Sequence, residues 1–467
     1  MPPASADVLS RSALEQARLI RAREISSEEL VRLYLGRIER HDGPLTSFVQ
    51  VLGARALRAA RKKDRGTMRA RDLPPFHGVP VGVKDLNLVR GAFCRMGSRA
   101  FRWFWSPVDD KLVAQLRRAG FVIVGKLSTS ELGAMPVTEP DIHPPTRNPW
   151  NLDHTSGGSS GGAGAAVAAN LLPIAQGSDG AGSIRIPAAF CGLYGLKPSR
   201  GRLANAYGMP DDHILYTDGP IARDVADAAA MLDVMAGVTV GRPHTAPLPS
   251  RSFSELARDA PRGLRVRMVL SNPISAVDPE VKDAVRRAAR VLEALGHHIE
   301  EVDPPAGSIE EFLPIWQHIV STAPVLFASK LQPVTRWLAR EGRRHDGRRV
   351  LALQHQLAAR HLEWCEGADL ILSPTTPRPA PRVGAFASED PSRTFFGAAP
   401  LGAFTAPFNL TGQPAASLPL AVSSAGLPIG VQLGGKLLDD ATVLAVSRQL
   451  EEALPWAGRT SPVAAAT

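Results

Sequence analysis

Two glycine-rich segments that carry serines are the parts of this 467-residue sequence best suited to chemistry. The first is Gly157–Gly162 (GGSSGG), and the second is Gly177–Pro187 (GSDGAGSIRIP). In the second segment Ser183 follows three small residues whose backbone amides can converge. Converging amides can bind an oxyanion, and a helix expected to start at Ser183 would add the positive end of its dipole. Taken alone, the same pattern also fits an anion-binding turn without chemistry, or glycines that serve close packing.

A lysine at the end of an expected strand is the third candidate. Residues 78–83 (GVPVGV) alternate as a strand does and deliver Lys84 and Asp85 at its end. A serine hydroxyl group is a weak nucleophile unless a base takes its proton. A lysine can be that base only when neutral, which burial favours. For Lys84 taken alone, a solvated lysine at a strand end is the alternative interpretation.

A different hydrolase mechanism is suggested by Gly158–Gly162, which matches G-x-S-x-G. That motif would make Ser160 the nucleophile of an α/β-hydrolase, and it requires a histidine partner late in the chain. The last histidines, His345, His355 and His361, fall in a stretch expected to be helical rather than at strand ends. The motif alone is short and therefore weak support for this mechanism.

Cofactor motifs are not supported. Residues 120–126 read GxxxxGK, but Leu127 stands where a phosphate-binding loop has Ser or Thr, and the middle residues form an apolar strand. No GxGxxG follows a strand, and the histidines lack metal-binding spacing. We therefore expect neither a cofactor nor a metal.

Composition is typical of a folded protein, with 44% hydrophobic and 21% charged residues. The formal charge is +9, and the basic clusters lack nearby aromatic residues, so we do not expect nucleic-acid binding. No apolar stretch approaches the roughly 20 residues needed to span a bilayer, and the first residues lack a signal-peptide pattern. We expect a cytoplasmic protein without membrane contact. Its three cysteines, Cys94, Cys191 and Cys365, suggest no disulfide framework, and Cys191 is expected to be a buried packing residue.

The elements around the motifs predict an α/β fold. Two helices are expected within residues 10–41, the second opened by a capping box of Ser26 and Glu29. A helix over residues 110–119 followed by an apolar strand over 121–124 indicates a largely parallel sheet in this part. Further helices are predicted at 224–235 and 278–295, with strands at 264–270 and 368–372.

These elements divide the sequence into four segments, with a Pro- and Ser-rich linker over residues 241–263. Residues 1–70 form an N-terminal helical segment, and residues 71–240 form the core that holds the candidate site. Residues 241–400 hold the second part of the sheet and a variable helical substrate region. Residues 401–467 complete the core.

At this point the sequence resembles the amidase signature family, and the resemblance covers nearly the whole chain. The run over residues 157–198, which ends in AAFCGLYGLKP, is similar to that family's serine- and glycine-rich signature. Residues 78–85 (GVPVGVKD) match its lysine motif. Residues 147–150 (RNPW) and 408–415 (FNLTGQPA) also look like family blocks. The resemblance implies a single α/β/α domain with a central mixed β-sheet flanked by helices, similar to bacterial amidases that act on nylon oligomers and aryl amides.

The resemblance also implies a Ser–Ser–Lys triad. Matched by motif position, Ser183 is the nucleophile, Ser159 the bridging serine and Lys84 the base. The family pattern places Ser159 after a cis peptide bond, here the bond from Gly158.

The loop before the nucleophile would stabilise the oxyanion through the amides of Gly180, Ala181, Gly182 and Ser183. Many relatives have Gly-Gly before the nucleophile, whereas this chain has Ala181-Gly182. If position 181 needed a positive φ, its alanine would be strained. Asp179 and Arg185, which flank this loop, are expected to form an ion pair that braces it.

The expected function is hydrolysis of a C–N bond in a small aliphatic or aryl carboxamide. A carbamate hydrolase with the same triad is the alternative within hydrolases. An alternative of another class is the glutamine-hydrolysing component of a tRNA-dependent amidotransferase. A non-catalytic binding protein is disfavoured because all three triad residue types are present. The expected partner is a small-molecule amide or carbamate, and a homodimer stays open.

The pocket for that substrate is expected between the loop at residues 133–137 and the segment over 310–400. Large apolar residues of that segment suggest an apolar or aryl substrate, although ordinary core packing is an equally good explanation. They are Phe312, Leu313, Trp316, Leu326, Phe327, Trp337, Phe395 and Phe396.

Overall fold

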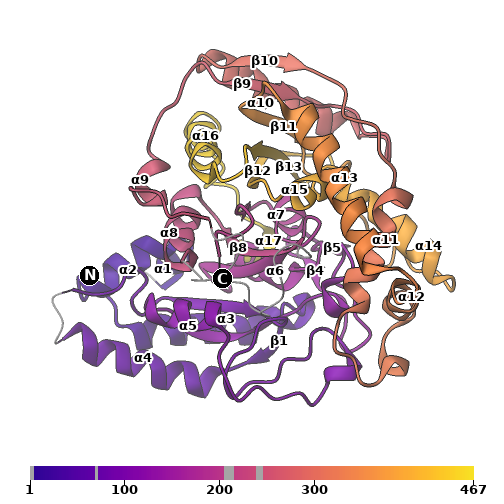
Figure 1. Cartoon of the computed structure of the whole chain (residues 1–467). Helices are drawn as coiled ribbons and strands as arrows, with labels where there is room; N and C mark the ends of the chain where they lie inside the picture. The colour runs from indigo at the N-terminus through magenta and orange to yellow at the C-terminus, as the bar shows by residue number, and fades with distance from the viewer. Residues whose placement is uncertain (1–4, 69–71, 204–214, 238–245, 467) are drawn as a thin grey trace.

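A mixed sheet of 11 strands forms the centre of the computed structural model, which describes residues 5–68, 72–203, 215–237 and 246–466 (Figure 1). The strand order is β1-β3-β2-β6-β8-β7-β12-β13-β11-β9-β10. Their bounds are β1 Phe48–Val51, β2 Pro80–Lys84, β3 Val122–Leu127, β6 Ile174–Asp179, β7 Tyr194–Lys197, β8 Thr217–Ala222, β9 Arg265–Met268, β10 His298–Glu301, β11 Leu370–Pro374, β12 Ala415–Val422 and β13 Pro428–Gly435. A separate pair consists of β4 Arg147–Asn148 and β5 Asn151–Thr155.

The sheet is parallel at two places and antiparallel between them, and its edge strand β1 is antiparallel to β3. Strands β3, β2 and β6 run parallel, as do β11, β9 and β10, whereas the pairs from β6 through β8, β7, β12 and β13 to β11 are antiparallel. The largely parallel sheet expected from residues 110–124 is therefore correct for β3, β2 and β6 and again for β11, β9 and β10, but not for the strands between these two groups. One reason is local, because β12 and β13 are joined by a short turn, which allows only antiparallel pairing.

Helices flank the sheet, as expected for the α/β/α class (Figure 1). Helices α1 to α9 precede β9 along the chain and are interspersed with strands β1 to β8. Helices α10 to α17 follow β9. The helices are α1 Ser5–Ser10, α2 Ala13–Arg21, α3 Ser27–Leu45, α4 Gly53–Thr67, α5 Lys111–Arg118, α6 Gly161–Ala168, α7 Arg185–Cys191, α8 Val225–Met235, α9 Phe253–Leu256, α10 Pro279–Ala294, α11 Ile309–Ser321, α12 Pro333–Gly342, α13 Gly347–Cys365, α14 Pro391–Ala398, α15 Ala406–Thr411, α16 Asp440–Ala453 and α17 Pro462–Ala465.

Local signals set several of these helix boundaries. Ser26 and Glu29 form the predicted capping box at the start of α3, with the Ser26 hydroxyl group accepting from the Glu29 amide at 3.1 Å. Asp278 caps α10, whose first residue is Pro279, as predicted. These contacts satisfy amide groups that a helix leaves unpaired at its first turn.

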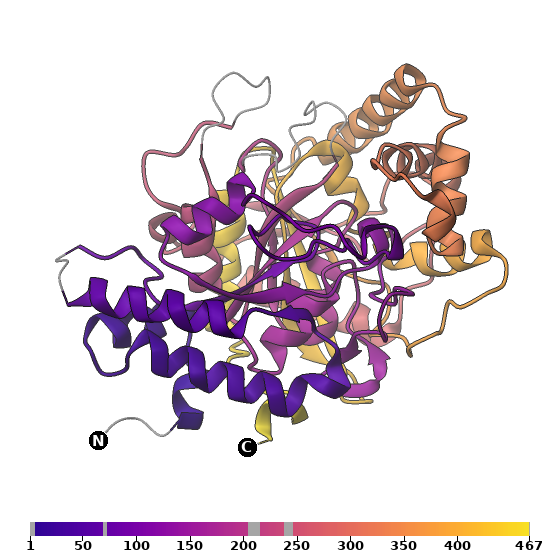
Figure 2. The same ribbon diagram turned by 90° about the horizontal axis from the view of Figure 1, so that it is seen from below.

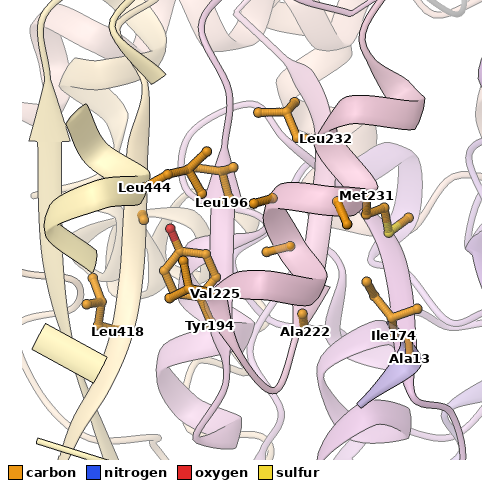
Figure 3. Close-up of a cluster of buried hydrophobic side chains, with 14 of the residues drawn as sticks. Ala13, Ile174, Tyr194, Leu196, Ala222, Val225, Met231, Leu232, Leu418 and Leu444 are labelled. Carbon is orange, nitrogen blue, oxygen red and sulfur yellow. The ribbon is translucent and has the colours of Figure 1, made fainter. Parts of the chain in front are cut away.

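The main hydrophobic core lies between the sheet and one helical layer. Figure 3 shows Tyr194 and Leu196 of β7 beside Leu232 of α8 and Leu444 of α16. These side chains are fully buried, although they come from segments far apart in the sequence. A second core cluster joins α3, α4, α6 and α7 on the other side. Because its inner helices α6 and α7 are rich in small residues, their backbones can approach the sheet closely.

Helices α11, α12 and α13 gather at one side of the molecule, away from the N-terminal helices (Figure 2). Residues 309–365 are therefore mainly helical, and strand β11 follows them. Strands β12 and β13, from the last segment, lie between β7 and β11 and join the two earlier parts into one sheet. The division at residues 70 and 240, and the first part of the expected linker at 241–263, fall on or beside residues outside those described.

No helix within the described residues is long and apolar enough to cross a membrane.

The packing of the core predicts that substitutions of two leucines will have very different effects on the free energy of unfolding. Leu196→Ala should lower the free energy of unfolding by about 2–5 kcal/mol, because it removes buried methyl groups and leaves a cavity. Leu326→Ala should change it by less than about 0.5 kcal/mol, because Leu326 is 90% exposed. Chemical denaturation of both variants measures the difference. Equal effects would contradict the placement of β7 at the centre of the core.

Candidate active site

Lys84 is the last residue of β2, and its side chain is fully buried. Its Nζ donates to Ser159 Oγ at 2.6 Å and to Ser178 Oγ at 3.0 Å. The structure thus brings together two of the three predicted catalytic residues, 75 positions apart in sequence. Ser178 was not singled out from the sequence, although it directly precedes Asp179 in the second glycine-rich segment.

Burial lowers the pKa of Lys84 to about 7, and the charges of Asp218 and Asp179 oppose this shift only in part. A buried amine loses the hydration that stabilises its ammonium form. The neutral amine, which can accept a proton, is therefore well populated near neutral pH. This is the electrostatic property that a lysine base needs.

Ser159 lies in the turn between β5 and α6. The Gly158–Ser159 peptide bond is cis, in agreement with the resemblance. A Cβ atom on Gly158 would lie 2.7 Å from the backbone of Val137, so only glycine fits there. The Ser159 carbonyl oxygen accepts from Thr138 Oγ1 at 3.3 Å. The turn is thus held against the loop at residues 133–138.

Ser183 lies between β6 and α7 and is 7% exposed. Its carbonyl oxygen accepts from the Ser160 amide at 3.2 Å, which ties the two serine-bearing turns together. Its hydroxyl group has no hydrogen-bond partner among the residues that the structure describes. Ser183 also lines an open pocket, so a substrate can reach it.

Ser160, the alternative nucleophile, is fully buried. Its Oγ donates to the Ser178 carbonyl at 3.1 Å and accepts from the Ser178 amide at 3.2 Å. Both bonds connect the turn to β6, and no described histidine contacts this hydroxyl group. The geometry does not support an α/β-hydrolase mechanism through Ser160.

Asp179 and Arg185 form the ion pair expected from the sequence, at 2.9 Å and fully buried. Burial alone would raise the pKa of Asp179, but Arg185, together with Lys197 and Asn409, outweighs it and holds that pKa well below its usual range. Arg185 also donates to Gln432 and Asn409, each at 2.7 Å. Asn409 in turn donates to the Asp179 carbonyl oxygen at 2.8 Å. The loop that carries Ser183 is therefore fastened to a strand and a helix from the end of the chain.

The structure corrects one part of the expected oxyanion site. The Gly182 amide donates to Asp179 Oδ1 at 2.7 Å, and the amide of Ile184 donates to Asp179 Oδ2 at 3.2 Å. Helix α7 begins at Arg185 rather than at Ser183, and Asp179 occupies amides at its N-terminus. The Gly182 amide is therefore not free to bind an oxyanion.

The amides of Gly180, Ala181 and Ser183 have no hydrogen-bond partner within the described part of the chain, so they are the available donors. The positive φ of this loop falls on Gly182, at 124°, and not on Ala181. A Cβ on Gly182 would also clash with Thr405, whose Oγ1 would lie 2.2 Å from it. The alanine at position 181 therefore introduces no backbone strain.

The pocket at Ser183 has a volume of about 190 Å³ and is mainly apolar. Three of the aromatic residues expected there, Phe312, Trp316 and Phe395, line it, as do residues 133–136 of the expected loop. Leu326 and Phe327 are instead exposed to solvent. The remaining three, which are Leu313, Trp337 and Phe396, pack against the neighbouring core. Sequence could not separate these groups because all lie in the same amphipathic helices and loops.

His361 also lines the pocket, a placement that the sequence did not indicate. Its ring contacts Phe408 and Trp364, with ring centroids 5.5 and 5.4 Å away. Burial lowers its pKa to about 4, so the imidazole is neutral at neutral pH. Cys191 is buried in packing contacts, as expected. No group of three or more metal-ligating side chains occurs in the described ranges.

Comparison with known proteins agrees with this geometry. A family model described as Amidase matches residues 29–444. The 6-aminohexanoate-cyclic-dimer hydrolase of Paenarthrobacter ureafaciens is 37% identical, covering 97% of this chain and 96% of its own length. A component of the glutamyl-tRNA(Gln) amidotransferase of Desulforapulum autotrophicum is 34% identical, covering 96% of this chain and 98% of its own.

Two solved structures are similar over nearly the whole chain. A 6-aminohexanoate cyclic dimer hydrolase complexed with substrate has a TM-score of 0.90 and 32% identity, covering 98% of this chain and 99% of its own. A bacterial aryl acylamidase has a TM-score of 0.87 and 26% identity, covering 96% and 99%. With a buried lysine and serine in contact, a pocket-lining serine in a turn bonded to theirs and these matches, the chain belongs to the amidase signature family and is an amidohydrolase that acts on amides.

Proposed function

We propose that this amidohydrolase cleaves the C–N bond of small aliphatic or aryl carboxamides through an acyl-enzyme on Ser183, with Ser159 as proton relay and Lys84 as base. The observation that carries the proposal is the 2.6 Å bond from the buried Lys84 amine to Ser159 Oγ. The turn that holds Ser159 is bonded through the Ser160 amide to the carbonyl oxygen of Ser183, which lines the pocket. A neutral amine in that position can take a proton from the hydroxyl group that contacts it.

The reaction follows from these groups. Ser183 Oγ attacks the carbonyl carbon while its proton passes through Ser159 Oγ to Lys84 Nζ. The amides of Gly180, Ala181 and Ser183 donate to the oxygen that becomes negative. The C–N bond then breaks as the leaving nitrogen takes the proton from the relay. Water attacks the acyl-enzyme, and the carboxylic acid leaves.

The substrate class rests on the pocket and on the relatives. Apolar walls formed by Trp316, Phe312 and Phe395 favour an uncharged aliphatic or aryl group beside the scissile bond. The names of the similar structures, a cyclic dimer hydrolase and an aryl acylamidase, are in keeping with this class. A carbamate presents the same carbonyl and nitrogen, so a carbamate hydrolase stays the second candidate.

Glutamine hydrolysis for a tRNA amidotransferase is a third candidate because several relatives carry that name. The largely apolar pocket is a poor match for the charged α-amino and α-carboxyl groups of free glutamine. A panel of anilide, aliphatic amide, cyclic amide, carbamate and glutamine substrates separates the three candidates.

Replacement of Ser183 tests the nucleophile. Ser183→Ala should reduce kcat/KM for a chromogenic anilide by at least about 10³-fold, because no acyl-enzyme can form. A fluorophosphonate probe should label Ser183 in the wild-type protein, as read by peptide mass spectrometry, and should not label the variant. The probe attached to Ser160, or full turnover by Ser183→Ala, would contradict the proposal.

The pH dependence tests Lys84. Only the neutral amine is a base, so kcat/KM should rise with pH through a midpoint near 7, the pKa of Lys84, and then level off. Lys84→Ala should lose about 10²–10⁴-fold in rate together with this acid limb. Activity that falls over the same pH range would rule out a neutral lysine base.

Replacement of Trp316 tests whether the apolar pocket sets the substrate preference. Its ring lies against the oxyanion loop, since a Cβ on Gly180 would be 3.3 Å from it. Trp316→Ala should lower kcat/KM for an anilide relative to acetamide by about 10-fold or more, because the aryl group loses its apolar contact. Phe327→Ala, at an exposed aromatic residue in the same segment, is the control and should leave the ratio unchanged.

A further inference from the structure

Asp218 lies on β8 directly opposite Ser178 of β6. Opposed residues of antiparallel strands place their side chains on the same face of the sheet. Ser178 is also a hydrogen-bond partner of the Lys84 amine, at 3.0 Å. The Ser178 side chain is therefore a neighbour of both the buried Asp218 carboxyl group and the amine of Lys84.

Gln176 joins the two residues. Its Oε1 accepts from the Lys84 backbone amide at 2.9 Å, and its Nε2 donates to Asp218 Oδ1 at 2.7 Å. The same Nε2 donates to Asn87 Oδ1 at 3.1 Å. This fully buried amide side chain fixes the position of Asp218 relative to the strand that ends in Lys84. The network crosses three neighbouring strands, β2, β6 and β8.

The other charged groups packed around Lys84 are already neutralised or engaged. Asp179, on β6, pairs with Arg185, and Asp85, which follows Lys84, pairs with Lys126 of β3 at 2.8 Å. Asp110, near Asp218, caps α5 and accepts two backbone amides. Helix α6, which packs against β2, carries no titratable residue.

Among the described residues, Asp218 has no ion-pair partner within 4 Å. Burial raises its pKa to about 7, with Asp110 raising it further and Lys84 opposing the shift. The carboxyl group and the amine thus titrate in the same pH range, and each affects the other. Above neutral pH an ionised Asp218 faces a neutral lysine.

We propose that Asp218 is a positioning residue. Its negative carboxylate stabilises the positive ammonium group that forms on Lys84 when Ser183 attacks. The inference rests on the proposed function. No proton needs to reach Asp218, because it acts by its charge on Lys84. Without that charge the ammonium form would be less stable in a buried site, so Lys84 would be less basic.

Asp218→Asn keeps the shape and the hydrogen bond from Gln176 but removes the charge. We expect two changes in the full-length enzyme with a chromogenic anilide. The acid limb of kcat/KM should move to lower pH by about 0.5 to 1 unit, and the kcat plateau should fall by about 10-fold. A purely structural role would lower activity without moving the acid limb. Asp218→Glu, which restores the charge, should return the midpoint toward the wild-type value.

Glu451→Gln is the matched control. Glu451 is also a carboxyl group whose pKa is raised to about 7, mainly by burial, but it lies on α16 and accepts from the Val225 amide. The pH profile of kcat/KM for Glu451→Gln should superimpose on that of the wild-type protein. If Asp218→Asn does not fold, Asp218→Ser removes the same charge with a smaller side chain, and the same shift is expected.

An acid limb of the folded Asp218→Asn variant that superimposes on that of the wild type would overturn the role of Asp218. That result would leave the proposed function intact, since the wild-type enzyme would still turn over through Ser183. Conversely, turnover by Ser183→Ala would overturn the proposed function regardless of Asp218.

Discussion

The hydrogen bond between the buried amine of Lys84 and the hydroxyl group of Ser159 is the interaction on which the rest of the site depends. Its importance for the proposed mechanism comes from burial. Removing a lysine from solvent lowers its pKa far enough for the amine to accept a proton near neutral pH. The sheet provides this environment, because β2 lies between β3 and β6 and is buried along its whole length.

A second constraint is that the loop carrying Ser183 must be rigid while its hydroxyl group stays accessible. The Asp179–Arg185 pair supplies rigidity from inside the loop. Asn409 and Gln432, more than 200 residues later, complete the hydrogen bonds of that pair. A buried ion pair costs hydration, and it persists where further hydrogen bonds satisfy both partners. The same carboxylate takes up the amides at the start of α7, which leaves fewer amides for a substrate.

The two sides of the site differ in polarity and in exposure to solvent. The lysine side is polar and closed, with Ser178, Gln176 and Asp218 arranged across neighbouring strands. The pocket side is apolar and open, with walls from helices between residues 309 and 398. A scaffold that keeps these surfaces apart can change its apolar pocket while the buried polar groups around Lys84 stay in place.

Sequence by itself determined the local features and the family, whereas only the tertiary structure decided which groups share a buried environment. The glycine-rich serine segments, the caps of α3 and α10 and the Asp179–Arg185 pair involve neighbours within a few residues, so spacing and residue type predict them. Strand pairing between β6 and β8 instead places Asp218 opposite Ser178, a hydrogen-bond partner of the Lys84 amine, and nothing near Asp218 in sequence signals that placement. The Gly182 amide looked available in sequence but is taken by a carboxylate that folds back on it. Helix packing rather than hydrophobicity sets which aromatic side chains of residues 310–400 reach the pocket. Long-range pairing and burial thus determine the electrostatics, and a linear pattern does not encode them.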